Sequence, residues 1–406
     1  MKTLTYTHQN SVSKTIPLIN KHKDRGNSLN DFLIVGGGVI GMMTARILAD
    51  SGADVTIVDR GLLCNESSWA GGGIVSPLYP WRYRPEITAL ANWSQGYYPQ
   101  LAKVLAEETG IDPEFRSGGM LMLRVDDEAE ALAWAEKYQQ PLTQVTKEFI
   151  YSTEANIAPG KEQAIWMPEV GSIRNPRLGK ALKKSLEQRP NVRILEHVEV
   201  KSIRVMDGQA IGVNTANSVL SAGQVIVCSG AWSSGLLKAE GQEGENLLPE
   251  FPIEPVRGQM MVYKAEPGLV NRVVMLDGRY VIPRNDGRIL VGSTLEYDGF
   301  NKQTTEEARQ SLQASAEALI PALKDIPVEH HWCGLRPGSP DGVPFIGAVE
   351  EVGHLHVNAG HFRNGLVLAP AATELLCNQL LGQQAIIDPA PYQPSSRLKE
   401  TEGEMI

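Results

Sequence analysis

The sequence predicts an α/β protein in which a domain built on a parallel sheet is interleaved with an α+β domain built on an antiparallel sheet. Three observations support this. The structured chain opens at Asp31 with a strand, a glycine-rich turn, a helix and a second strand, which together form a βαβ unit. Short, wholly apolar strands of the same kind return in the middle and near the end of the chain. The segments between them carry antiparallel strand patterns and amphipathic helix patterns.

Each expected strand of the parallel sheet is a continuous apolar run, as in a strand buried on both faces. These runs lie at residues 32–35, 55–58, 225–228 and 355–358. A helix follows the first run, extends through Ala49 and stops at Gly52. Another helix is expected at residues 366–381, after Gly360.

The second domain mixes helices with antiparallel strands. Amphipathic patterns predict helices at residues 92–109 and 127–138. Strands are predicted at residues 260–263, 279–283 and 288–292. Asn285-Asp286-Gly287 supplies the turn between the last two strands, so these form a hairpin.

The turn of the βαβ unit carries a dinucleotide-binding pattern, with glycines at Gly36, Gly38 and Gly41. The first glycine permits a tight turn, the second lets the backbone approach a pyrophosphate, and the third lets the helix pack closely on the strand. Asp59 ends the next strand, where a carboxylate binds the adenosine ribose. A strand, a helix and this acid around the glycines make the pattern much more specific than the glycines alone.

Two features favour FAD over NAD as the dinucleotide. The motif lies at the start of the structured chain, so the rest of the sequence wraps back onto it. A second glycine-rich stretch, residues 67–74, suits a loop that lies flat against a large ring system. A flexible linker is the alternative reading of that stretch. A site for NADP would place a basic residue at the ribose, and here Asp59 holds that position with Arg60 beside it.

We therefore expect a discontinuous FAD-binding Rossmann-like domain interleaved with an antiparallel-sheet substrate domain. The FAD-binding domain is predicted at residues 31–84, 165–240 and 335–390, and the substrate-binding domain at residues 85–164 and 241–334. Residues 1–30, which hold five basic residues and one acid, are expected to be a disordered extension, with an organelle transit peptide as the alternative. Residues 391–406 are expected to be a C-terminal tail.

Composition limits the classes of partner. At 406 residues the chain exceeds the size of one core. A net charge of −9 without a basic cluster argues against nucleic acid, and no stretch approaches the roughly 20 apolar residues of a membrane span. The four cysteines are scattered, as in a reducing compartment, so a cytoplasmic protein is expected.

Several segments together resemble the glycine oxidase and D-amino acid oxidase family of flavoproteins, and within it the branch that serves thiazole synthesis for thiamine. The similarity runs from Asp31 to about Leu381. The segments that carry it are Ile34–Gly41, Trp69–Pro77, Ser229–Ser233, Tyr280–Arg284, Gly334–Gly338 with Asp341-Gly342, and Ala359–Gly365. The combination of Gly-Leu-Arg-Pro-Gly with Gly-His-Phe-Arg-Asn-Gly is the most specific part.

The resemblance implies FAD-binding residues position by position. They are Gly36, Gly38, Val39, Ile40, Gly41, Asp59, Arg60, Ser67, Ser68, Gly72, Gly73, Ile74, Val200, Gly230, Trp232, His361, Phe362, Arg363, Asn364, Gly365, Leu366 and Val367. The last seven would bring a helix start to the flavin pyrimidine, where its dipole stabilises negative charge on reduced flavin. Two positions depart from the family: Asp59 where Glu is more usual, and Glu66 where a basic residue is frequent.

The resemblance also implies a substrate site. Arg336 would bind the carboxylate of an amino acid, because a guanidinium donates two parallel hydrogen bonds. The Tyr280 hydroxyl would be a second donor, and Arg363 lies beside both or fixes the flavin-side loop. No catalytic side chain is assigned, since the flavin carries the chemistry.

The expected reaction is oxidative deamination of glycine or a similar small amine, with hydride passing from the substrate α-carbon to flavin N5, an imine as product, and O2 reduced to hydrogen peroxide. One alternative is a D-amino acid or sarcosine dehydrogenase that uses a quinone. Another is a flavin-carrying subunit of a larger complex. A homo-oligomer is implied only by the resemblance.

Two remaining features, the paired histidines and Cys333, bear on metal binding and on covalent attachment of the flavin. The pairs His330-His331 and His354/His356 have no acid or cysteine at ligand spacing, so no metal site is expected. Cys333 lies near the place where sarcosine oxidase relatives attach flavin covalently. We expect a small buried residue there and FAD bound without a covalent bond.

Overall fold

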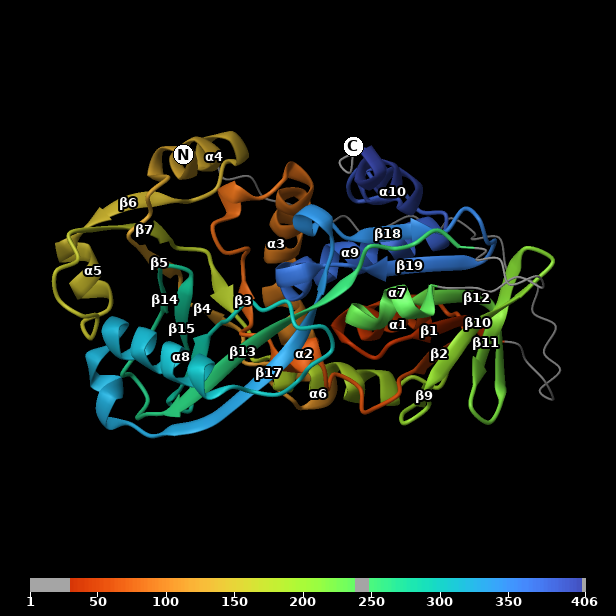
Figure 1. Ribbon diagram of the computed structural model, residues 1–406, viewed down its shortest axis with the longest axis horizontal. Coiled ribbons are helices and arrows are strands. Elements are labelled where there is room, and N and C mark those ends of the chain that lie inside the picture. The colour runs from red at the N-terminus through yellow and green to blue at the C-terminus, as the bar shows by residue number, and fades with distance from the viewer. Residues whose placement is uncertain (1–29, 238–247, 404–406) are drawn as a thin grey trace.

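A computed structural model describes residues 30–237 and 248–403. The predicted N-terminal extension lies outside the described residues, apart from Asn30. Figure 1 shows an elongated molecule with two sheet-based regions side by side, joined by two long strands that run diagonally between them. The mixed α/β architecture and the separation into two kinds of sheet agree with the predicted fold class.

The first sheet contains the predicted βαβ unit. Its parallel strands, in spatial order, are β9 (Val192–Leu195), β2 (Val55–Val58), β1 (Asn30–Val35), β12 (Val219–Val227) and β19 (Leu355–Ala359). Antiparallel neighbours complete it: β18 (Phe345–Ala348) beside β19, and β10 (Val200–Met206) with β11 (Gln209–Thr215) beside the first half of β12. Strands from the start, middle and end of the chain therefore meet in one sheet.

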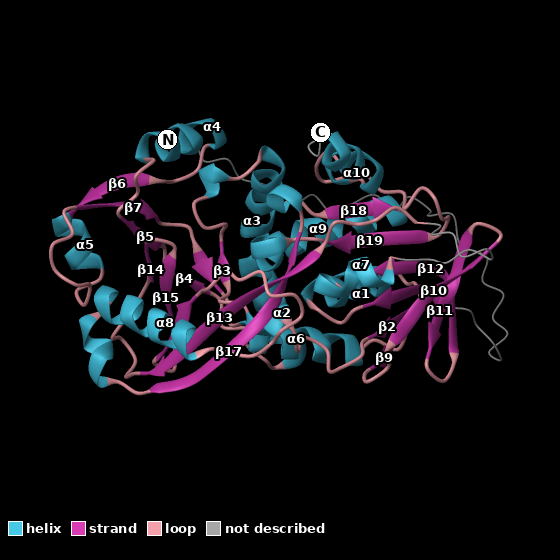
Figure 2. Ribbon diagram, viewed as in Figure 1, coloured by secondary structure: helices cyan, strands magenta, loops and turns pink. Residues whose placement is uncertain are grey.

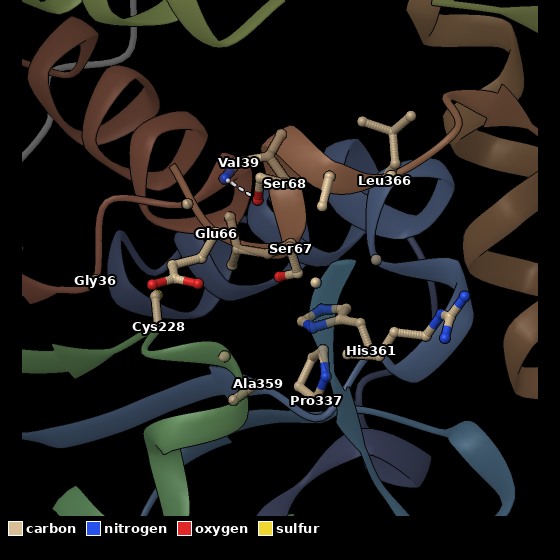
Figure 3. A pocket seen from close by; sticks show the side chains of 18 of the residues that line it. Gly36, Val39, Glu66, Ser67, Ser68, Cys228, Pro337, Ala359, His361 and Leu366 are labelled. Carbon is tan, nitrogen blue, oxygen red and sulfur yellow. Dashed lines mark hydrogen bonds between the residues drawn. The ribbon is translucent and has the colours of Figure 1, made fainter. Parts of the chain in front are cut away.

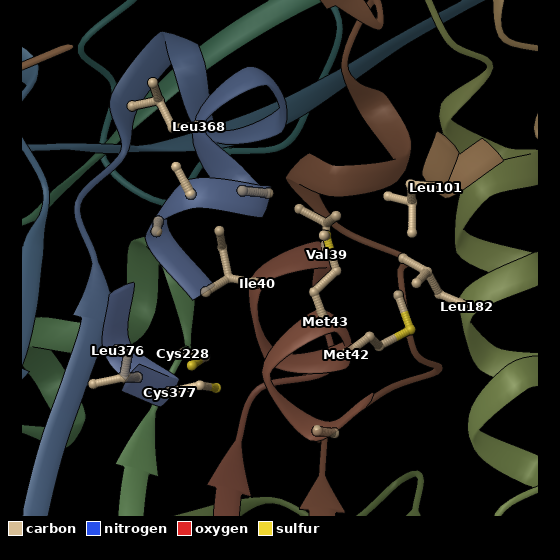
Figure 4. Packing of buried hydrophobic residues seen from close by; sticks show 14 of the residues in the cluster. Val39, Ile40, Met42, Met43, Leu101, Leu182, Cys228, Leu368, Leu376 and Cys377 are labelled. Carbon is tan, nitrogen blue, oxygen red and sulfur yellow. The ribbon is translucent and has the colours of Figure 1, made fainter. Parts of the chain in front are cut away.

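Both faces of this sheet are buried, which explains the unbroken apolar runs. Phe32 and Ile34 face a cluster with α1 (Val39–Asp50), α3 (Pro85–Thr109), α6 (Asn175–Glu187) and α9 (Gly365–Leu380), whereas Leu33 and Val35 face a cluster on the other side. Figure 4 shows Met42 and Met43 of α1 facing Leu101 and Leu182, with Ile40 turned toward α9.

The second sheet is almost wholly antiparallel, with one parallel pair, β14 with β5. Its order is β17 (Val328–Gly338), β13 (Glu254–Lys264), β16 (Arg288–Gly292), β15 (Arg279–Pro283), β14 (Val273–Leu276), β5 (Met120–Leu123), β7 (Gln163–Met167) and β6 (Thr143–Thr146). The long ribbon of β13 and β17 reaches from this sheet toward the first one (Figure 2). It thereby carries residues of the second sheet to the edge of the nucleotide-binding region.

The remaining elements are short or peripheral. A small sheet joins β3 (Ile74–Val75), β8 (Gly171–Ser172) and β4 (Arg116–Ser117). The other helices are α2 (Ser67–Ala70), α4 (Glu128–Tyr138), α5 (Lys147–Thr153), α7 (Ser233–Leu236), α8 (Glu306–Leu319) and α10 (Pro394–Gly403). Single turns lie at η1 (Pro80–Arg82), η2 (Gly230–Trp232), η3 (Pro321–Asp325), η4 (Pro340–Gly342), η5 (Phe362–Asn364) and η6 (Ala390–Tyr392).

Three elements are longer than the sequence predicts. Helix α3 begins at Pro85 rather than near residue 92, because proline is well suited to the first helical turn. Strand β13 extends well beyond residues 260–263, because it is hydrogen-bonded on both sides, to β17 and β16. Strand β12 starts at Val219, where it pairs with β11 before entering the parallel sheet, and it ends before Cys228.

The domain limits stay a prediction. The expected boundaries at residues 165 and 335 fall inside β7 and β17, which both belong to the second sheet. In the expected C-terminal tail, α10 places the buried Arg397 against Asp341 of η4. Within the described residues, the helices are too short or too polar to cross a membrane.

Candidate functional site

A cavity of about 440 Å³ lies where the first sheet meets the β13–β17 ribbon. Its walls come from the turns after β1, β2 and β12, from α2 and the loop that follows it, and from β10, β15, β17 and the start of α9. Figure 3 shows Gly36, Val39 and Glu66 on one side of this cavity and Pro337, Ala359 and His361 on another.

The structure brings the candidate site residues together around this one cavity. Every FAD-binding and substrate-binding candidate from Gly36 to Val367 lines it, with the single exception of Gly41. A Cβ at Gly41 would lie against the carbonyl oxygen of Gly36, so this glycine lets α1 approach β1. That is the packing role expected of the third glycine in the motif.

The turn after β1 lines the cavity with Gly36, Gly38 and Val39. Gly36 has a φ of +113°, and a Cβ there would meet the Cys228 carbonyl. The amide of Val39, at the first turn of α1, donates to Ser68 Oγ at 2.9 Å (Figure 3). The start of a helix attracts negative charge, so this corner suits a pyrophosphate.

Asp59 lies at the end of β2 and faces the same corner. Its two carboxylate oxygens accept hydrogen bonds from the amides of Gly37, at 2.7 Å, and Gly61, at 2.8 Å. These bonds hold the carboxylate between the glycine turn and the loop after β2. A carboxylate oxygen can accept more than one bond, so both remain able to accept from ribose hydroxyls.

The second glycine-rich stretch is a tightly supported wall. Gly73 has a φ of +83°, and a Cβ on Gly72 would lie 2.8 Å from Ile282 and 3.3 Å from Tyr280. Behind the wall, the buried Arg284 donates to the carbonyls of Gly72, at 2.7 Å, and Ile173, at 3.1 Å. Burial lowers the pKa of Arg284 to about 10, so the guanidinium stays charged at neutral pH.

The start of α9 contributes buried polar groups that lack partners within the described protein. His361 Nε2 and Asn364 Nδ2 are buried and unbonded. Burial also lowers the pKa of His361 to about 3, so its ring is neutral. Unsatisfied buried polar atoms are costly, and a cofactor with several acceptors and donors would satisfy them. These residues therefore fit FAD.

The substrate candidates lie beside that wall. Arg336, on β17, donates to Ser293 Oγ at 2.8 Å and to the Thr294 carbonyl at 3.1 Å. Burial lowers its pKa, and the neighbouring charge of Arg363 acts in the same direction, whereas Tyr280 opposes it. Neither arginine forms an ion pair with any residue that the structure describes.

The acids that line the cavity lie at its other end. They are Asp59, Glu66 and Glu199. Glu66 pairs with Arg60, and Glu199 lies within electrostatic reach of the same arginine. The end beside Arg336 is therefore a cationic pocket, suited to an anion such as a carboxylate.

Sequence reasoning missed several lining residues, chiefly Gly258, Met260, Ser293 and Tyr83. A Cβ at Gly258 would collide with the Arg336 guanidinium, so this glycine makes room for the arginine. No sequence motif marks Gly258, because its neighbour Arg336 is far along the chain. Ser293, in contrast, directly follows a predicted strand, which is where site residues often lie.

A second cavity, of about 1110 Å³, adjoins the cationic end. Both cavities are lined by Leu78, Tyr83, Phe362 and Arg363. Among its other lining residues are Arg82, Arg124 and Tyr297. Arg363 therefore lies between the two cavities.

The other sites considered from the sequence lie elsewhere. Cys333 does not line the cavity, and its thiol contacts the Lys302 carbonyl. His356 bonds Gln224 at 2.7 Å. In the described ranges, no three His, Cys, Asp or Glu side chains are grouped to hold a metal ion.

Comparisons with known proteins agree with this geometry. The sequence model of a family described as FAD dependent oxidoreductase matches residues 31–379. The glycine oxidase of Pseudomonas putida is 50% identical over 366 residues, which are 90% of this chain and 98% of that protein. The bifunctional protein ThiO/ThiG of Trichormus variabilis is 28% identical over 361 residues, 87% of this chain and 53% of that protein.

A solved structure leads to the same family. The glycine oxidase of Geobacillus kaustophilus superimposes with a TM-score of 0.82 at 28% identity, over 90% of this chain and 98% of that chain. Because the family match covers most of the sequence and includes both glycine-rich stretches and the start of α9, the chain belongs to the FAD-dependent oxidoreductase family.

Proposed function

We propose that this protein is a glycine oxidase, which oxidises the C–N bond of glycine or a similarly small amine. The observation that carries the proposal is the cationic pocket of Arg336 and Arg363 beside Tyr280, next to the Gly72 wall. The glycine oxidase of P. putida, at 50% identity over almost its whole length, supports the same substrate.

When bound beside these residues, FAD would supply the hydride acceptor for the substrate α-carbon. The protein supplies orientation. Arg336 is held by Ser293 and Thr294 rather than by an acid, so its remaining donors stay available for a substrate carboxylate. Tyr280 is buried beside Gly72 and would add a hydroxyl donor. Held in this way, the α-carbon would face the wall formed by Gly72 and Gly73.

The pocket also favours one protonation state of the substrate. An amine must be neutral before hydride leaves its carbon. The acids that line the first cavity are Asp59, Glu66 and Glu199, so among its described lining residues no further carboxylate could hold an ammonium group beside Arg336. Two nearby cations raise the cost of an ammonium further. The amino acid anion is therefore the form that this site would bind best.

The proposal also covers the electron acceptor, the pathway and the location of the enzyme. We take O2 as the electron acceptor, with peroxide as product, and the thiazole branch of thiamine synthesis as the pathway. The unpaired cysteines favour a cytoplasmic enzyme. A homo-oligomer is expected from the family resemblance alone, and the mass of the holoenzyme in solution tests it.

The test is peroxide release by the purified yellow holoenzyme with glycine, sarcosine, D-alanine and D-proline. Arg336→Ala should lower kcat/KM for glycine by about 100-fold or more, because losing one partner of a buried charged pair costs about 2–5 kcal/mol. Arg309→Ala, on the exposed face of α8, is the matched control and should leave kcat/KM unchanged.

The outcomes separate the alternatives. Reduction of an artificial dye by glycine without peroxide would replace O2 by a quinone-type acceptor. Bound flavin with no turnover of any of the four substrates would overturn the proposal and leave a flavin-carrying subunit.

A further inference from the structure

The segment between β16 and α8, residues 293–305, is tied to β13 at both of its ends. Near its start, Glu296 exchanges backbone hydrogen bonds with Arg257 and accepts from the Arg257 Nε at 2.8 Å. Near its end, the Thr305 amide donates to Gln259 Oε1 at 2.9 Å. Arg257 and Gln259 are buried, so these attachments are firm. Between these ends, Arg257 also pairs with Asp298 at 2.9 Å, and the Cys333 thiol of β17 contacts the Lys302 carbonyl.

That middle part lies over the wall of the cofactor cavity. The ring of Phe300 stacks on Trp232 with centroids 5.5 Å apart, and Lys302 Nζ lies 2.7 Å from Glu66 Oε2. Trp232 and Glu66 line the cavity, whereas Phe300 and Lys302 do not. The segment therefore contacts the outer side of residues whose inner side faces the cofactor.

Arg60 connects these two contacts. Its guanidinium lies 3.8 Å from the Trp232 ring centre and 3.3 Å from Glu66. The result is a continuous chain of contacts from Lys302 through Glu66, Arg60 and Trp232 to Phe300. This chain borders the cavity at the end that contains Asp59, which is the end expected to hold the adenosine.

The arrangement also accounts for the unusual acid at position 66. A carboxylate in the wall of a phosphate-binding cavity repels the ligand unless its charge is balanced. Here the charge of Glu66 is balanced by two cations, Arg60 and Lys302. Lys302 belongs to the segment between β16 and α8, so its pairing with Glu66 fixes that segment against the cavity wall. A basic residue at this position would repel Lys302 and could not form the same closure.

We propose that residues 293–305 form a strap that retains FAD, with Phe300 and Lys302 as its closing contacts. The Phe300 ring and the Lys302 side chain would release these two contacts to admit or release the cofactor, while the backbone of the strap stays attached to β13 and β17. The contacts suit an openable closure, because Lys302 and Phe300 are 44% and 53% exposed and exposed ion pairs and ring contacts are individually weak. The proposal depends on FAD binding and not on which amine is oxidised.

The experiment follows release of FAD from diluted holoenzyme by the rise in flavin fluorescence. The variants are Phe300→Ala, Lys302→Ala and the double substitution. We expect the double variant to release FAD roughly tenfold faster than the parent protein, since it loses a ring stack and an ion pair. Leu295→Ala, in the same segment and also exposed, is the matched control and should release FAD at the parental rate.

Two further measurements distinguish a loss of FAD retention by the strap from general damage to the fold. Added salt should accelerate FAD release from the parent and from Phe300→Ala more than from Lys302→Ala, because only the first two keep the Lys302–Glu66 pair. Lys302→Arg and Phe300→Tyr, which preserve charge and ring, should restore slow release. If the double variant releases FAD at the same rate as Leu295→Ala, the strap does not retain the cofactor and the proposal is wrong.

Discussion

The two ends of the cofactor cavity are built in opposite ways. The end beside Asp59 is centred on one short stretch, because Gly36, Asp59 and Arg60 belong to a single βαβ unit and its adjoining loop, to which β10 and the turn after β12 add further wall residues. The end beside Arg336 is assembled from segments that are far apart in the sequence, including Gly72, Gly258 and Tyr280. Local chain geometry shapes the first end, and long-range packing shapes the second.

Their charges differ as well. At the end beside Asp59, Arg60 is paired with Glu66 and both are partly exposed, so the charges are balanced and hydrated. At the other end, Arg336 donates to a hydroxyl and to carbonyls, without an acid among the described residues. A balanced site binds a ligand mainly through shape and hydrogen bonds. An unbalanced, half-buried cation favours an anionic ligand strongly, because little water competes for it.

After Arg336→Ala, the largest effect is expected from filling the space that Gly258 leaves for Arg336. Gly258→Ala would push the guanidinium aside, and overpacking of this kind costs about 1–3 kcal/mol. We expect kcat/KM for glycine to fall up to about 100-fold, with FAD still bound, because the change affects only the cationic end. Steady-state kinetics measures kcat/KM, and the absorbance of the flavin measures the bound FAD.

The matched control for this prediction is Gly96→Ala, on α3, where an added Cβ meets no atom within 4 Å. It should leave kcat/KM unchanged. Loss of FAD from Gly258→Ala would show that the two ends of the cavity do not act separately.

A smaller effect, at the opposite end, is expected for Asp59→Asn. The backbone N–H groups of Gly37 and Gly61 now donate to the two carboxylate oxygens. A side-chain amide in place of the carboxylate would turn its own N–H group toward one of them, and that hydrogen bond would be lost. Weakening one charged hydrogen bond costs about 1.5 kcal/mol, so FAD affinity should fall about tenfold. The KM for glycine at saturating FAD should not change. Titration of apoprotein with FAD tests this, with the exposed Asp54→Asn as control.

The smallest effect concerns His356, a partly buried base that, unlike Arg336, is neutral in the folded protein at neutral pH. Burial, with a contribution from His354, lowers the pKa of His356 to about 4. A histidine in the unfolded chain titrates near about 6.5, so the unfolded state binds the proton first. Stability therefore falls as the pH drops from about 6.5 toward 4, and the contribution is fully present above that window.

His356→Gln removes this titration and can still bond Gln224. Between pH 7 and pH 5, its free energy of unfolding should decrease by about 2 kcal/mol less than that of the parent protein. Urea unfolding at the two pH values measures the difference. His330→Gln, an exposed position on β17, should behave like the parent. If the free energy of unfolding decreases equally in His356→Gln and in the parent protein, His356 of the parent is already protonated in the folded state.

Four of the five parallel strands of the first sheet agree with the sequence prediction, because strands buried on both faces are apolar at every position, whereas β9, which carries the exposed Arg193, was missed. The limits of β2, β15 and β16 agree with prediction. The prediction was too short for β13, whose length depends on pairing with β17 and β16. It was also too short for α3, although the first turns of this helix bury Ile87, Leu90 and Ala91 at helical spacing. Among the site candidates, Gly41 is the one that does not line the cavity, since its role is to let α1 pack on β1.

By itself, the sequence determined the dinucleotide turn, the acid at the end of β2 and the kind of cofactor, because these depend on contacts between residues close in the chain and on side-chain chemistry that a motif displays. Only the tertiary structure decided that Gly258 makes room for Arg336, that Arg284 supports the Gly72 wall, and that residues 293–305 cross to Glu66. Such contacts join segments separated by many residues, so they are set by how the sheets pack and leave no periodic pattern in the sequence.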